Sequence, residues 1–85
     1  MISKIIKFMR VKKGLTQEEI AKLLNVAPST ISGYETNYSQ PTFEMIERIA
    51  DVCDFKIEFN NNDGTSVNSK NIDRMSWKYL KTDKQ

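Results

Sequence analysis

The sequence predicts a mainly α fold in which four short helices form a bundle, followed by a β-strand or hairpin and a C-terminal tail. Three observations support this. Apolar residues recur at helical spacing in separate stretches before Phe55, residues typical of helix ends stand between those stretches, and the apolar period changes to two at Phe55. The 85 residues suffice for one domain with a modest core.

The first helix is predicted over residues 2–13. Its apolar residues follow the i, i+3, i+4, i+7 spacing of one helix face and are Ile2, Ile5, Ile6 and Met9. Basic side chains are typical of the last turn of a helix, which is where Lys12 and Lys13 stand. Gly14, just beyond them, is typical of a helix end.

The second helix is predicted to begin after Thr16. Thr16 and Glu19 have the spacing of a capping box, in which each side chain accepts a backbone N–H of the first turn. The residues expected to be buried are Ile20, Ala21 and Leu24. Asn25 suits the helix end because asparagine tolerates a positive φ.

The third helix follows after only a few residues and is predicted over 28–35. Pro28 suits its first turn, since proline has a preset φ and no N–H to leave unpaired. Ile31 and Tyr34 are expected to face inward. The remaining positions are small, polar or uncharged, which suits close approach to another surface; they are Pro28, Ser29, Ser32 and Gly33.

A fourth helix is predicted from Thr42, as its cap, to about Cys53, with apolar residues at helical spacing. Residues 55–59 alternate apolar and charged side chains and predict a half-buried strand. Residues 60–64, with an Asp-Gly pair, suit a hairpin turn, and residues 65–68 a return strand. The tail, residues 69–85, has the loose spacing of a short helix around Trp77.

Composition excludes several classes of protein. No histidine is present and Cys53 is the one cysteine, so we expect no metal site, no cofactor, no disulfide and no catalytic centre. The lone thiol suits a cytoplasmic protein, and neither a signal peptide nor a membrane span is predicted. Charge is segregated: residues 1–30 carry a net +4, residues 31–60 a net −4 and residues 61–85 a net +2. A segregated basic surface suits a partner rich in phosphate.

Two short helices joined by a tight turn, the second with a small polar outer face, indicate a helix-turn-helix. From Arg10 to Asp54 the chain closely resembles the phage-repressor and Cro family of DNA-binding transcriptional regulators, whose fold is lambda-repressor-like. The matching residues are Arg10, the run Lys13 to Ala21, Leu24, Val26, the run Ser29 to Ser32, Glu35, Pro41, Ile46, Ile49 and Ala50.

The resemblance implies roles for single residues. Those implied to contact bases in the major groove are Pro28, Ser29, Ser32 and Gly33. Those implied to contact DNA phosphates are Thr16, Gln17, Thr30, Asn37 and Tyr38. Arg10 and Glu35 match a pair that forms an ion pair between the first and third helices. Two positions depart from the family: Ala27 replaces the usual capping hydroxyl, and Pro28 and Gly33 offer no side-chain hydrogen bonds to bases.

The likeness fades after Asp54, where many members continue with a fifth helix. We therefore divide the chain into a helix-turn-helix DNA-binding domain, residues 1–54, and a strand or hairpin with a tail, residues 55–85, expected to mediate dimerisation. An exposed apolar strand is an aggregation liability, so Phe55, Ile57 and Phe59 are expected to pair across a homodimer. The alternative is an intrachain hairpin packed on the fourth helix.

The function expected from the resemblance is a dimeric repressor that binds a double-stranded DNA operator in the cytoplasm, without enzymatic activity. Two alternatives remain. One is the antitoxin of a toxin–antitoxin pair, which would hold a toxin protein and regulate its own operon. The other is a protein-interaction module that kept the fold without DNA binding.

Overall fold

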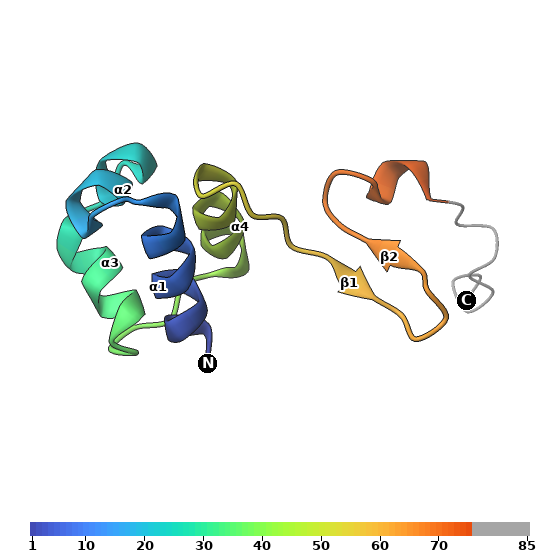
Figure 1. Cartoon of the computed structure of the whole chain (residues 1–85), viewed down its shortest axis with the longest axis horizontal. Helices are drawn as coiled ribbons and strands as arrows, with labels where there is room; N and C mark the ends of the chain where they lie inside the picture. The colour runs from blue at the N-terminus through green and yellow to red at the C-terminus, as the bar shows by residue number, and fades with distance from the viewer. Residues whose placement is uncertain (76–85) are drawn as a thin grey trace.

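The computed structural model describes residues 1–75. Its elements are the helices α1 (Ile2–Lys13), α2 (Gln17–Leu24), α3 (Pro28–Glu35) and α4 (Phe43–Val52), the strands β1 (Phe59–Asn60) and β2 (Ser66–Val67), and the 3-10 turn η1 (Ile72–Arg74). The predicted fold class, four helices with a small C-terminal hairpin, is confirmed (Figure 1).

The helix ends follow the local chemistry of the sequence. Gly14 and Asn25 adopt left-handed φ angles of 84° and 59°, which end α1 and α2. Thr16 forms the predicted capping box: its Oγ1 accepts the N–H of Glu19 at 3.0 Å, and the Glu19 carboxylate accepts the N–H of Thr16 at 2.8 Å. Thr42 caps α4 by accepting the N–H of Met45.

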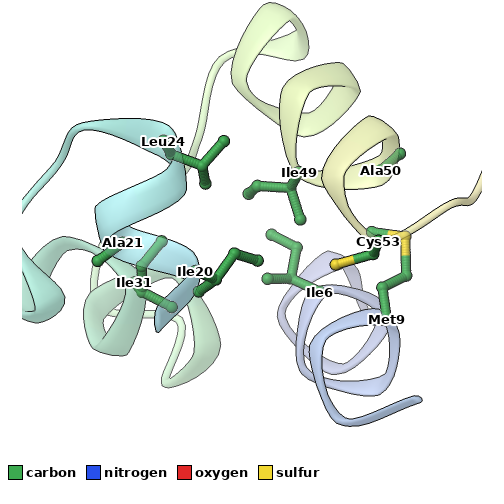
Figure 2. Packing of buried hydrophobic residues seen from close by; sticks show 9 residues of the cluster. All are labelled: Ile6, Met9, Ile20, Ala21, Leu24, Ile31, Ile49, Ala50 and Cys53. Carbon is green, nitrogen blue, oxygen red and sulfur yellow. The ribbon is translucent and has the colours of Figure 1, made fainter. Parts of the chain in front are cut away.

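The hydrophobic core lies where the four helices meet (Figure 2). Its buried members are Ile6, Met9, Ile20, Ala21, Leu24, Ile31, Ile49, Ala50 and Cys53. Ile5, expected on the buried face of α1, is 43% exposed because it lies at the edge of that face. Within the described residues, no fully buried apolar side chain lies beyond Cys53, so the helices alone supply the closed core.

The predicted strand over residues 55–59 is wrong in extent. Only Phe59 of that stretch belongs to β1, which pairs antiparallel with β2 through Phe59 opposite Val67 and Asn60 opposite Ser66. The reason lies at the end of α4: Asp54 adopts a φ of 64°, and the N–H of Phe55 donates to the carbonyl of Ala50 at 2.8 Å. The N–H of Phe55 is therefore used to end α4 and cannot also take part in a strand ladder.

The hairpin pairing is intrachain, which was the alternative left open by the sequence. Its turn is built by side chains that accept local N–H groups: Asn61 accepts from Asp63, and Asp63 from Thr65. Gly64 supplies the positive φ of 95° that the turn requires. Of the predicted tail helix, the described part contains only the three-residue turn η1; the remainder, residues 76–85, lies outside the described residues.

We call residues 55–75 the arm. Along the 46 Å long axis of the molecule, α2 and α3 lie at one end and the hairpin of the arm lies at the other (Figure 1). Phe55 and Ile57 pack on the helical core, and the ring of Phe59 lies 6.1 Å from that of Phe43 at the start of α4. The arm is thus attached along α4, away from the helices that the resemblance assigns to DNA.

Over residues 1–75, no helix has the length and apolar character needed to cross a membrane.

Candidate nucleic-acid interface

The N-terminus of α2 presents polar groups to solvent. Thr16 is exposed, and Gln17, the first residue of α2, is half-buried. Free N–H groups of a first helical turn and the positive end of the helix dipole favour an anion nearby. The acidic side chains of this turn, Glu18 and Glu19, are also exposed, and Glu19 is held back by its bond to the backbone of Thr16. An anion here would be met chiefly by Gln17 and the backbone.

Helix α3 has one polar face turned to solvent and one apolar face turned inward. Pro28 and Ser29 are exposed, Thr30 and Ser32 are half-buried, and Ile31 is fully buried. Ala27 makes no side-chain cap, as the sequence indicated, so Pro28 defines the first turn. The outer side of α3 therefore offers two hydroxyls within a short stretch and no charge.

Gly33 follows Ser29 by one helical turn, on the same side of α3, and its expected contact with bases stays a prediction. It is buried, and the N–H groups of Tyr38 and Ser39 donate to its carbonyl at 2.9 and 3.2 Å. A Cβ added at Gly33 would lie 3.0 Å from the Oγ of Ser39. The turn after α3 therefore folds over Gly33, and Ser29, Ser32 and Pro28 are the more accessible of the candidate base-contacting residues.

The turn after α3 projects from the surface. Asn37 adopts a φ of 63°, and Tyr38 is 90% exposed. The side-chain amide of Gln40 donates to the Oδ1 of Asn37 at 3.0 Å, which leaves the amide N–H groups of Asn37 for another acceptor. Both residues retain the exposed polar atoms that a phosphate contact requires.

Arg10, Gln17 and Glu35 form one hydrogen-bond network. The guanidinium of Arg10 donates to both carboxylate oxygens of Glu35, at 2.6 and 3.0 Å, and to the carbonyl of Leu15 at 2.8 Å. The pair expected from the resemblance is thus present, bidentate and nearly enclosed, with side-chain exposures of 12% and 3%. It ties α1 to the C-terminal end of α3.

The bond of Gln17 to this network was not foreseen from the sequence. Its Nε2 donates to Oε1 of Glu35 at 3.0 Å. No periodicity links two polar residues 18 positions apart, so only the packing of α2 on α3 reveals the contact. One N–H of the amide is used in this bond, and the second is left for an acceptor outside the protein.

The charge states of this network follow from its contacts. Burial raises the pKa of Glu35, but the hydrogen bonds from Arg10 and Gln17 outweigh it and hold that pKa below its usual value. The hydrogen bonds that Arg10 donates to the Glu35 carboxylate likewise raise the pKa of Arg10. Both groups are therefore charged at neutral pH. Among residues 1–75, no cluster of three or more side chains is suited to hold a metal ion.

The packing of the turn on Gly33 can be tested with Gly33→Ala. In a Ser39→Ala background the added methyl group meets no Oγ, and we expect a gain of about 0.5–1 kcal/mol in unfolding free energy from helix propensity. With Ser39 present, the 3.0 Å contact should cancel or reverse that gain. Urea denaturation of the four variants of this double-mutant cycle measures the difference. An equal effect of Gly33→Ala in both backgrounds would contradict the packing.

A protein-family model described as helix-turn-helix matches residues 6–60. A curated relative, the HTH-type transcriptional regulator AnsR of Bacillus subtilis (strain 168), is 39% identical over 46 residues. Those residues are 54% of this chain and 40% of the relative, so the chain spans less than half of that protein's length.

Proposed function

Because the chain belongs to the helix-turn-helix family, we propose that it is a non-enzymatic transcriptional repressor that binds double-stranded DNA as a homodimer, with α3 in the major groove. The coarser part of this function, a DNA-binding regulator, has the support of the family and of the relative's name. The proposed entry of α3 into the major groove is supported by the uncharged, solvent-facing side of this helix. The open N-terminus of α2 and the exposed turn at Asn37 and Tyr38 flank that side.

The residues of this surface divide into those that contact bases and those that contact phosphates. Ser29 and Ser32 contact base edges, and Pro28 meets the methyl group of thymine. Thr16, Gln17, Thr30, Asn37 and Tyr38 contact phosphates and fix the position of α3. Two hydroxyls provide little direct discrimination between bases, so much of the affinity comes from phosphates and from the shape of the DNA.

Two copies are proposed because one small uncharged face gives a weak complex. The arm carries the candidate contacts between copies, Phe55, Ile57 and Phe59. Phe55 and Ile57 are already half-buried against the helices of their own chain, so Phe59, at 60% exposure, and the outer edge of β1 offer the larger free surface. A dimer would place two α3 helices on half-sites about one helical turn of DNA apart.

The division of roles predicts distinct effects of three substitutions. Ser29→Ala and Ser32→Ala should each change the preferred bases, at a cost of about 0.5–1.5 kcal/mol for the preferred site, since each removes a single hydroxyl contact. Gln17→Ala should weaken all sites similarly and reduce the salt dependence of binding. Selection of bound sequences from a random DNA pool, repeated with each variant, measures both effects.

Two outcomes of that selection contradict the proposal. Strong guanine preferences at every half-site position would be incompatible with a face that carries only two hydroxyls. Failure of every pool member to bind, at low as well as moderate salt, would instead favour a protein-interaction module. Sedimentation that shows a monomer at tens of micromolar would remove the dimer from the proposal.

A further inference from the structure

The side of α1 turned away from the core carries exposed apolar side chains between lysines. Ile5, Phe8 and Val11 follow one another at intervals of three residues and are 43%, 63% and 57% exposed. Lys4 and Lys12 stand four residues before and after Phe8, so they lie on the same side of the helix. Both lysines are exposed, and neither has an ion-pair partner within residues 1–75. We call these five residues the basic stripe.

An apolar groove of about 290 Å³ lies between the start of α4 and the arm. Phe43 from α4 and Phe59 from β1 form part of its wall; their ring centroids lie 6.1 Å apart, and both side chains remain exposed. Glu47 also belongs to the wall, and Glu44 precedes it by one turn on the same side of α4. Neither carboxylate has an ion-pair partner within residues 1–75. The groove is therefore apolar with an acidic border, and it complements the basic stripe in both respects.

We propose that the basic stripe of one copy lies in the groove of a second copy, and that the groove of the first copy receives the stripe of the second. This inference rests on the homodimer of the proposed function and names the surfaces that join its two copies. In each copy α4 packs on α1 and forms one wall of the groove, so the stripe and the groove adjoin the same helix (Figure 1). A two-fold axis near α4 would form both contacts at once, as a closed dimer requires.

Charge favours this pairing over the two other symmetric pairings of these surfaces. Two stripes in contact would bring lysines together, and two grooves in contact would bring carboxylates together. Like charges that face each other across an interface cost free energy. A stripe in a groove instead joins opposite charges and removes exposed aromatic rings on both sides from water.

The pairing is also continuous with the surface already proposed for dimerisation. Phe59, a wall residue of the groove, belongs to β1, so a copy seated there also lies beside that strand. In the stripe, the ring centroid of Phe8 lies 6.3 Å from that of Phe55, the first residue of the arm. The stripe and the arm therefore present neighbouring apolar surfaces to a second copy.

An exchange of charges tests the pairing. One variant carries Lys4→Glu and Lys12→Glu, and the other carries Glu44→Lys and Glu47→Lys. Each variant alone should dimerise at least about tenfold more weakly than the unaltered protein, because both contacts of its dimer then join like charges. An equal mixture should form a heterodimer about as stable as the original dimer, since both of its contacts join opposite charges. Sedimentation equilibrium in about 0.15 M salt, which screens the long-range attraction of the net charges, measures all three samples.

Phe8→Ala tests the apolar part of the contact. It should weaken the dimer by about 100-fold, because each of the two copies loses an aromatic ring from the interface. Leu23→Ala is the matched control, since Leu23 is 59% exposed but lies on α2, outside the stripe and the groove. Lys22→Glu, on the same helix, is the corresponding control for charge. Both controls should leave the dissociation constant of the dimer unchanged.

The outcomes separate this pairing from the dimer itself. If the unaltered protein dimerises and Phe8→Ala has no more effect than Leu23→Ala, the pairing of stripe and groove is overturned while the dimer stands. Charge variants that fail to recover on mixing overturn it in the same way. A monomer at tens of micromolar in the unaltered protein removes the dimer of the proposed function and this pairing together.

Discussion

Replacing Arg10 with methionine is expected to lower the free energy of unfolding by about 3–5 kcal/mol, because the Glu35 carboxylate would remain nearly enclosed without its cation. Glu35 is 3% exposed and has Arg10 and Gln17 as its hydrogen-bond donors. Total stabilities of small domains are about 5–15 kcal/mol, so the loss should be visible in any urea titration.

The variant should also change how stability depends on pH. In the unaltered protein the pKa of Glu35 lies below its usual value, so its contribution is present above the unfolded pKa and is lost as pH falls through the folded one. Without Arg10, burial dominates and raises that pKa, so the penalty is full at neutral pH and is relieved by protonation. The difference between the two proteins should therefore begin to shrink above the ordinary carboxyl pKa of about 4.3, as pH falls through the raised pKa of the variant, and it should go on shrinking until pH has fallen through the lowered pKa of the unaltered protein.

Two comparisons make the result specific to the enclosed pair. Adding Glu35→Leu to Arg10→Met should recover much of the loss, because no buried charge is left unpaired. Lys13→Met removes an ion pair with Asp54 at an exposed position, where solvent screens the charges, and should cost far less than Arg10→Met. If Arg10→Met and Lys13→Met were equally mild, the account of the enclosed pair would be wrong.

Glu58→Pro is expected to abolish dimerisation and to weaken binding to a two-half-site operator by about 100-fold or more, through the loss of avidity. The N–H of Asn61 donates to Thr65 at 2.7 Å, so by the alternation of an antiparallel ladder the N–H groups of Glu58 and Asn60 point away from β2. That edge, which has no partner strand within residues 1–75, is where a second copy would add a strand. Proline removes its N–H and blocks pairing there.

Glu58→Ala is the control, since it loses the same side-chain contacts with Lys56 and Asn68 while it keeps the backbone N–H. Sedimentation equilibrium and DNA titration measure the two effects, and binding to an isolated half-site should be unchanged in both variants. Persistence of the dimer in Glu58→Pro would exclude this edge as the contact between copies.

The parts of the fold governed by neighbouring residues followed from the sequence. The capping box at Thr16, the left-handed ends at Gly14 and Asn25, and the start of α3 at Pro28 depend on side chains within a few positions of each other. The parts governed by distant contacts did not. The burial of Gly33 did not follow from the sequence because the turn that covers it folds back from Tyr38 and Ser39, and the strand at 55–59 was overextended because the N–H of Phe55 donates to the carbonyl of Ala50. The bond of Gln17 to Glu35 has the same origin.

No apolar side chain in the described part of the arm is fully buried, so the arm can open locally without unfolding of the helices. The amides of β1 and β2 should exchange with solvent deuterium through openings of the arm alone, while those of α1 and α4 should exchange only when the whole bundle unfolds. Two units with separate opening equilibria can accept substitutions independently. The proposed contact surface between copies can therefore diverge among related chains while the helices proposed to face DNA stay intact.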